Sequence, residues 1–147
     1  MKASEIKVGN VYYVNFEPHK RGEFDKTHLA LVLKKTVNEV TFIVIPMTSE
    51  PDGSTGCKKN KVYLDVTDYL PPHLRKNPSY AVYDQVRTVN ASRFQKLYED
   101  RKEYDAKVPE SIVNQVIEEI IRNLLFDFSD ERKDIILNAL RTVDSSS

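Results

Sequence analysis

The sequence predicts an α+β fold that is mainly β, in which a curled sheet or small barrel is followed by C-terminal helices. Two observations lead to this prediction. Short apolar runs alternate with turn or charge clusters over the first two thirds of the chain, as in antiparallel sheets. In the last third, apolar residues recur at helical spacing instead. A chain of 147 residues fits one domain, so we expect a single domain over 1–147 with its barrel at about 8–107.

The first part of the chain holds the expected strands. In the first of them, alternation places Tyr12, Val14 and Phe16 on one face. The second is apolar on both faces, which predicts a central strand buried on each side. The expected strands cover residues 11–16, 29–33, 40–47, 61–66 and 79–89.

Helices are expected at three places. Asn90 can cap a short helix that follows the strands. Residues 109–126 carry a wide stripe of isoleucine, valine and leucine at helical spacing, and Pro109 suits a first helical turn. A second C-terminal helix is expected at 129–143, because Ser129 can cap it and acidic residues follow in its first turn.

The composition argues against several classes of protein. Cys57 is the only cysteine, so the chain forms no internal disulfide. No apolar run approaches the roughly 20 residues of a membrane helix, and the first ten residues lack the apolar segment of a secretion signal. We therefore expect a cytoplasmic protein without membrane contact. Metal-ligand spacings and glycine-rich phosphate loops are also missing, so we expect no metal and no cofactor.

The net charge is zero, but its distribution is uneven. Residues 1–97 hold 15 Lys/Arg and 10 Asp/Glu, whereas residues 98–147 hold 7 and 12. The first part can therefore attract a polyanion although the whole chain is neutral. Basic residues gather in the two polar loops that interrupt the strands, at Lys20, Arg21, Lys26, Lys58 and Lys59. Such clusters neutralise phosphates, although a charge run is usually just an ordinary solvated surface.

Two further side chains fit a nucleic-acid ligand. Phe24 lies in a polar loop, where its ring is available to stack on an unpaired base. Arg87 lies in a strand that is expected to be half-exposed, where it can contact RNA, support the site or form an ordinary ion pair.

Several segments, in this order, resemble the MazF/PemK toxins. Residues 9–16 resemble the glycine-led, aromatic-rich opening strand of that family, and residues 22–23 and 30–33 its first loop and second strand. Residues 45–49 are similar to the end of its third strand, and residues 84–89 to a late strand. Each motif alone is weak, but their common order and spacing is fairly specific.

The resemblance, which spans about residues 8–126, implies a fold and an activity. It implies an SH3-like barrel that forms homodimers and cuts single-stranded RNA without a metal. The 2′-hydroxyl attacks the neighbouring phosphate, which gives a cyclic phosphate and a free 5′-hydroxyl. It also implies a cognate acidic antitoxin that lies across the RNA groove.

The family's catalytic residues carry over only in part. Its members use an arginine at the start of the second strand and a threonine at the end of the third, with help from a loop glutamate. The resemblance carries the threonine onto Thr48 and the glutamate onto Glu23. This sequence has His28 where the family has its arginine. Ser49 and Gln85 lie in the matched motifs and are expected to contact RNA.

His28 therefore leaves two functions open. Imidazole is a common general acid or base, so His28 can replace the arginine in a working nuclease. Alternatively, the chain is an inactive SH3-like module that binds RNA or protein and lost cleavage with the arginine. A third hypothesis, a gyrase-inhibiting relative on the same barrel, rests on fold analogy alone.

Overall fold

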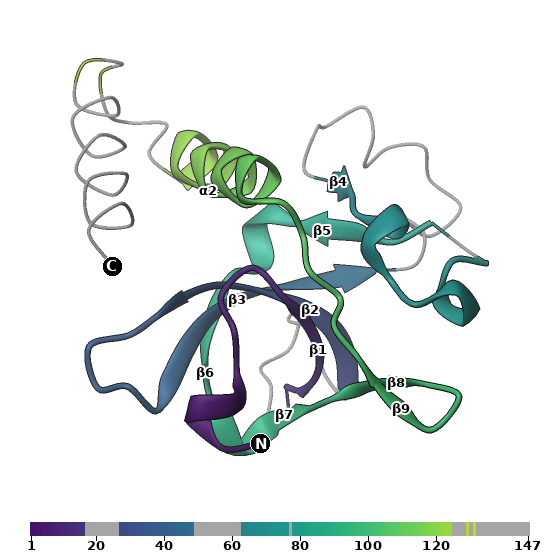
Figure 1. The fold of residues 1–147 in the computed structure, drawn as a ribbon. Coiled ribbons are helices and arrows are strands. Elements are labelled where there is room, and N and C mark those ends of the chain that lie inside the picture. Colours follow the sequence, from purple (N-terminus) through teal and green to yellow (C-terminus); the bar gives the residue numbers. More distant parts are fainter. Residues whose placement is uncertain (17–26, 49–62, 77, 125–128, 130, 132–147) are drawn as a thin grey trace.

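A curved antiparallel sheet with a helix across one side forms the described part of the protein (Figure 1). The computed structural model describes residues 1–16, 27–48, 63–76, 78–124, 129 and 131. The strands are β1 Val11–Asn15, β2 Thr27–Lys35, β3 Thr41–Thr48, β4 Tyr63–Asp65, β5 Tyr80–Val82, β6 Arg87–Asn90, β7 Phe94–Gln95, β8 Leu97–Glu99 and β9 Lys102–Tyr104. The helix is α2 Glu110–Leu124, and short 3-10 turns are η1 Ala3–Glu5, η2 Thr67–Tyr69, η3 Pro72–Leu74, η4 Tyr83–Gln85 and η5 Ala91–Arg93.

Seven of the described strands form one sheet in the order β4-β5-β3-β2-β1-β7, and β6 pairs with β3 beside β5. Strand β3 pairs with both β6 and β5 along the same edge. Its residues Thr41 to Val44 pair with β6, and Met47 and Thr48 pair with β5. The turn η5 joins β6 directly to β7 at the other edge of the sheet. Among the described strands no ladder joins β6 to β7, so closure into an SH3-like barrel stays a prediction.

The sheet curls strongly enough to enclose a core of its own. The rings of Phe42 on β3 and Phe94 on β7 lie 5.5 Å apart, although β2 and β1 separate these strands in the sheet. In a flat sheet, three strand spacings would hold them about 14 Å apart. The inner core, as we name the cluster on this concave side, consists of Ile6, Tyr12, Val14, Phe16, Ala30, Val32, Phe42, Val44, Val89, Ala91 and Phe94.

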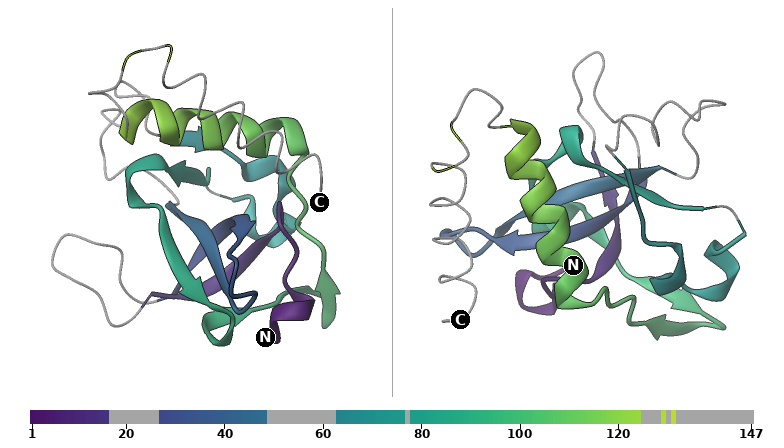
Figure 2. Two further views of the ribbon diagram at one scale, coloured as in Figure 1. Left: turned by 90° about the vertical axis from the view of Figure 1, so that its left-hand side faces the viewer. Right: turned by 90° about the horizontal axis from the view of Figure 1, so that it is seen from above.

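Helix α2 covers the opposite face of the sheet (Figure 2). Its residues Val113, Val116 and Ile120 are buried against Leu31 and Ile45, which alternate with the inner-core residues of β2 and β3. The predicted stripe of the helix therefore packs on the sheet. Burial of one large aliphatic side chain contributes about 1.5–3 kcal/mol, so this contact fixes the helix firmly.

The segment that leads into α2 is tied to the start of β1. The backbone N–H of Val108 donates to the carbonyl of Gly9 at 2.9 Å, and that of Val11 donates to Ala106, also at 2.9 Å. The buried Asn10 side chain donates to the carboxylate of Asp105. Gly9 has a φ of 90°, a conformation that favours glycine.

Most predicted elements are present with shifted ends. The central strand expected at 29–33 extends over Thr27–Lys35, and it is buried on both faces as predicted. The region 79–89 is divided between β5 and β6 by η4, which packs against α2. Asn90 caps η5 as predicted, since its side chain accepts from the N–H of Ser92 at 2.9 Å. The helix predicted at 129–143 lies outside the described residues, apart from its positions 129 and 131.

Candidate functional site

Three side chains from different strands meet at one end of the inner core. Phe16 follows β1, His28 lies near the start of β2, and Arg87 begins β6. The Cζ atom of Arg87 lies 5.0 Å from the centre of the Phe16 ring, and the centre of the His28 ring lies 6.4 Å from it. In the sheet, β6 is separated from β1 by β3 and β2, so its curvature brings these residues together. We call them the Phe16 cluster.

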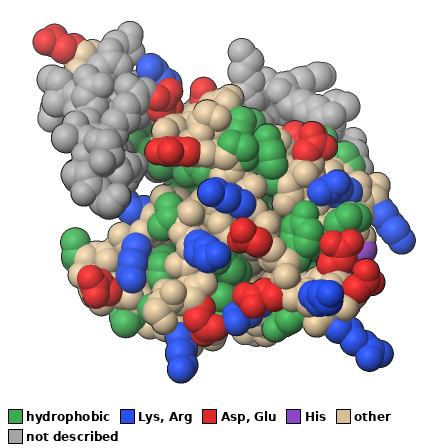
Figure 3. Space-filling model, viewed as in Figure 1, with side chains coloured by type: hydrophobic (Ala, Val, Ile, Leu, Met, Phe, Trp, Pro, Cys, Tyr) green, Lys and Arg blue, Asp and Glu red, His purple; other side chains and the backbone are tan. Residues whose placement is uncertain are grey.

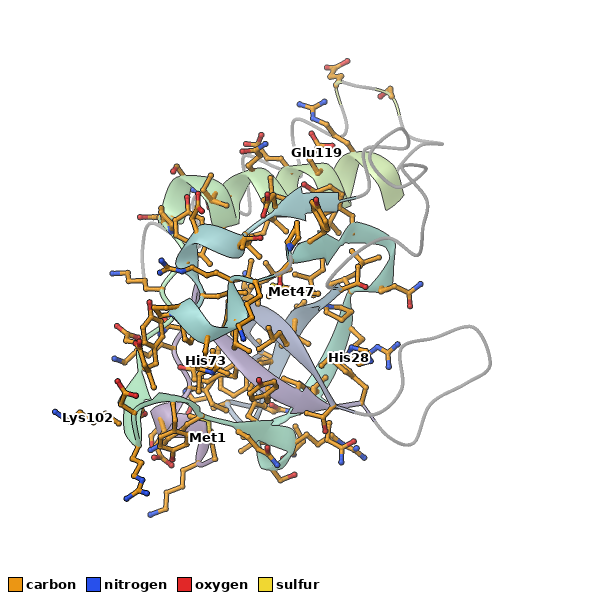
Figure 4. All side chains as sticks on the ribbon, turned by 90° about the vertical axis from the view of Figure 1, so that its right-hand side faces the viewer. Met1, His28, Met47, His73, Lys102 and Glu119 are labelled. Carbon is orange, nitrogen blue, oxygen red and sulfur yellow. The ribbon has the colours of Figure 1, made fainter. Side chains whose placement is uncertain are left out.

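The Phe16 cluster lies on the concave side of the sheet. His28 is two residues from Ala30, and Arg87 is two residues from Val89, and both of these neighbours belong to the inner core. Phe16 is only 3% exposed, whereas the side chains of His28 and Arg87 are partly exposed. The cluster therefore places two polar groups at the surface around a buried ring. His28 lies on the side of the molecule away from Lys102 (Figure 4).

Thr48 ends β3 at the same end of the sheet. Antiparallel β2 and β3 pair Val32 with Val44 and Ala30 with Pro46, and the same register continued by two residues brings His28 level with Thr48. The side chain of Thr48 is partly exposed, and alternation from Val44 places it on the inner-core side. The structure thus brings two of the predicted catalytic residues, His28 and Thr48, to one end and one face of the sheet.

These groups differ in what they can do chemically. An imidazole can accept and donate a proton near neutral pH. A threonine hydroxyl can donate a hydrogen bond to an oxyanion. A guanidinium stays positively charged throughout the physiological range and binds phosphate through paired N–H groups. The combination suits a phosphate ester, in which protons move while negative charge grows.

Gln85, predicted to contact RNA, ends η4 and is half-buried. It lies on the segment that leads into Arg87, and η4 packs against α2. The other predicted site residues lie outside the described residues. They are Lys20, Arg21, Glu23, Phe24, Lys26, Ser49, Lys58 and Lys59.

Phe16 was not among the predicted site residues. Alternation placed Phe16 on one face of the first strand with Tyr12 and Val14, and the structure buries that face in the inner core. Its role at the site depends on contact with β6, which is distant in the sequence. The alternation of residues 11–16 was the available signal, but alternation gives no partner on another strand.

A second concave surface lies elsewhere, beside η1 and β7. It is lined by Met1, Glu5, Tyr13, Gln95, Lys96 and Tyr98. The ammonium of Lys96 lies 2.7 Å from the carboxylate of Glu5, and the hydrogen bond between them raises the pKa of Lys96 and lowers that of Glu5. Since Glu103 also lies 3.5 Å from Lys96, acidic groups balance the cation of this groove.

The face seen in Figure 3 shows basic, acidic and apolar side chains intermixed, without a large patch of one sign. In the described part of the chain, no helix is long and apolar enough to span a membrane. The same residues contain no group of three or more His, Cys, Asp or Glu side chains placed to hold a metal ion.

The chain matches a known protein family over most of its length. The family described as "PemK-like, MazF-like toxin of type II toxin-antitoxin system" matches residues 7–124, which include the whole described sheet and α2. The class defined by this match is that of toxins from type II toxin–antitoxin systems. The chain belongs to the MazF/PemK family of these toxins, whose members are endoribonucleases.

The fold is similar to that of a solved MazF structure. MazF (Form-I) from Deinococcus radiodurans has a TM-score of 0.54 and 22% sequence identity, and the match covers 82% of this chain and 96% of that one. The Mycobacterium tuberculosis toxin MazF-mt6 has a TM-score of 0.47 and 17% identity, with 80% and 97% covered. A MazE-MazF structure (Form-II) from Deinococcus radiodurans has a TM-score of 0.47 and 20% identity, with 82% and 95% covered. A comparison with curated proteins gives no match.

Proposed function

We propose that this protein is a metal-independent, sequence-selective endoribonuclease that cleaves single-stranded mRNA as the toxin of a type II system, on an SH3-like barrel. The observation that carries the proposal is the placement of His28 and Thr48 at one end and one face of the sheet, within the segment that matches the family. The partly exposed side chains of both residues suit contact with a substrate.

The reaction is a transesterification within the RNA. The 2′-oxygen forms a bond to the adjacent phosphorus, and the bond from phosphorus to the 5′-oxygen breaks. The proton of the 2′-hydroxyl goes to a base, and the leaving 5′-oxygen gains a proton. The products are a cyclic phosphate and a 5′-hydroxyl. Water is not a reactant, and no metal takes part.

In this proposal each site residue has a distinct task. His28 moves a proton, because imidazole suits general acid–base catalysis. Thr48 donates its hydroxyl hydrogen to a phosphate oxygen as charge develops there. Glu23 orients the attacking hydroxyl or the base.

Affinity for RNA comes mainly from groups around the site. The loop cations Lys20, Arg21, Lys26, Lys58 and Lys59 neutralise phosphates, and Phe24 stacks on a base. Ser49, Gln85 and Arg87 complete the RNA surface. Because such contacts are electrostatic, binding weakens as the salt concentration rises.

The proposal includes a partner, an assembly and a compartment. A cognate antitoxin with an acidic segment covers the same basic surface in the cytoplasm, and two copies of the chain form an isologous homodimer that shares one RNA groove. Light scattering at micromolar concentration should give the mass of two chains. The mass of a single chain would contradict the homodimer.

The second candidate function is an inactive binding module. The observation that favours it is His28 itself, which stands where the resemblance implies the family's arginine. Such a module would bind RNA, or a protein such as the antitoxin, without cutting.

One assay separates the two candidates. The purified protein is incubated with a long single-stranded RNA in the presence of a chelator, and the ends of the fragments are analysed. We expect fragments with cyclic phosphate and 5′-hydroxyl ends, and far fewer of them with Thr48→Val. Uncut RNA that is nevertheless bound would support the binding module, and cleavage that needs an added divalent metal would contradict the proposed mechanism.

A further inference from the structure

The proposed cleavage needs a cation beside the phosphate. The attacked phosphate carries one negative charge in the substrate, and a second develops as the 2′-oxygen attacks. Preorganised charged donors stabilise such a transition state strongly. The hydroxyl of Thr48 carries no charge, and an imidazole that exchanges a proton cannot also serve as a permanent cation. A further residue is therefore needed.

Arg87 meets this need by its position. Its guanidinium is a permanent cation. Its Cζ atom lies 5.0 Å from the centre of the Phe16 ring, within the range of a cation–π contact. The same ring lies beside the imidazole of His28. The buried side chain of Phe16 therefore lies next to both the guanidinium of Arg87 and the imidazole that transfers the proton.

Phe16 is suited to hold the guanidinium. It is 3% exposed and packed in the inner core, so its ring has little freedom to move. A guanidinium stacks through its face and donates hydrogen bonds through its edge, so contact with the ring is compatible with contact to phosphate oxygens.

We propose that Arg87 is a catalytic residue that donates to the non-bridging oxygens of the scissile phosphate, and that Phe16 is the positioning residue for its guanidinium. This inference rests on the proposed function. In this arrangement Arg87, on β6, supplies the permanent positive charge that His28, on β2, does not provide.

The test separates the rate of cleavage from the affinity for RNA. Single-turnover cleavage is measured at saturating protein with an RNA that has one cleavage site, and affinity is measured with the same RNA carrying a 2′-deoxyribose there. Arg87→Gln should lower the saturated rate by about 10²–10³-fold. Its affinity should fall by less than about 10-fold, as expected for loss of one phosphate contact.

Arg101→Gln is the matched control, because it removes the same charge from an exposed position in the turn of the β8–β9 hairpin. It should cleave at the parent rate. Phe16→Leu keeps an apolar side chain in the inner core but removes the ring, so it should lower the saturated rate while leaving affinity nearly intact.

Arg87→Lys serves if Arg87→Gln does not fold. It keeps the charge but loses the paired N–H groups, so its saturated rate should be at least about 10-fold below the parent rate.

The results distinguish an error in the role of Arg87 from an error in the proposed function. If the parent cuts RNA and the Arg87 variants cut at its saturated rate, Arg87 is at most a binding residue, and the inference is wrong while the proposed function stands. A fall in affinity alone leads to the same conclusion. If the parent cuts no RNA, the proposed function fails, and the inference fails with it.

Discussion

The imidazole of His28 packs beside the ring of Phe16, with ring centres 6.4 Å apart and planes inclined by 45°. Phe16 is buried in the inner core, and His28 is partly exposed at its end. A rigid apolar neighbour of this kind limits the orientations of the imidazole. The position is therefore well suited to a group that must present one nitrogen to a substrate.

If His28 moves a proton, His28→Ala should lower the cleavage rate by about 10²–10⁴-fold, the usual contribution of general acid–base catalysis. RNA affinity should change little, because the loop cations supply most of it. His73→Ala is the matched control, since His73 is exposed in η3, and it should retain the parent rate (Figure 4).

His28→Arg restores the residue that the family resemblance implies. It should cleave at the parent rate or faster, because a guanidinium is a permanent cation that binds phosphate through paired N–H groups. Cleavage by His28→Arg but not by the parent would identify this chain as an inactive binding module. If neither protein cuts any single-stranded RNA, the nuclease assignment is wrong.

The stability of the fold should depend on the buried stripe of α2. Val116 is fully buried on the sheet, whereas the neighbouring Gln115 is exposed. Val116→Asp should lower the free energy of unfolding by about 4 kcal/mol, because it buries an unpaired charge. Gln115→Asp should change it by no more than about 0.5 kcal/mol. Urea denaturation of both variants tests this, and equal stability would mean that the helix does not pack as described.

The turn of the β8–β9 hairpin holds two residues other than glycine in a strained backbone conformation, which a substitution can relieve. Glu99 pairs with Lys102, so Asp100 and Arg101 form a two-residue turn, and both have positive φ, 49° and 66°. Such a turn favours glycine at its second position. Arg101→Gly should therefore raise the free energy of unfolding by about 0.5–1 kcal/mol.

Asp100→Gly should give a smaller gain, because aspartate tolerates this conformation better than arginine. Chemical denaturation compares the two variants with the parent. A loss of stability in Arg101→Gly would show that the arginine side chain contributes more than its backbone strain costs.

The order of elements was predictable because local patterns determine it. Alternation in residues 11–16 correctly placed Tyr12, Val14 and Phe16 on one face of the strand and Val11 on the other, and the structure packs each face in a separate core. The apolar stripe of 109–126 predicted α2 within a few residues. These patterns arise because alternate or helically spaced side chains are buried, and such spacing can be identified from the sequence alone.

Other features depended on contacts between distant segments. The division of 79–89 follows from the geometry of β3, which pairs with β5 and β6 at different positions. The β8–β9 hairpin was missed, because its turn is Asp-Arg rather than Asn-Gly, and half of the residues in its strands are charged. The contact between Phe16 and Arg87 needs the curvature of the whole sheet, which no local pattern specifies.

Tyr83 lies in the core between the sheet and α2 and is 3% exposed. Burial, and to a smaller extent the negative charge of Glu119, raises the pKa of Tyr83 from 10.0 to about 12. Below about pH 10 the phenol is protonated in both the folded and unfolded states, so its contribution to stability is fully present. As the pH rises from 10 towards 12, the unfolded state ionises first, and that contribution is lost.

At about pH 11 this shift should lower the free energy of unfolding by roughly 1.4 kcal/mol, the equivalent of one pKa unit. Urea denaturation at about pH 9 and pH 11 measures the change. Tyr83→Phe should lose less stability over this interval than the parent, because phenylalanine does not ionise. Tyr98→Phe is the control, since Tyr98 is 53% exposed, and its loss should equal that of the parent. An identical loss in the parent and Tyr83→Phe would mean that the Tyr83 phenol is as easily ionised in the folded protein as in the unfolded chain.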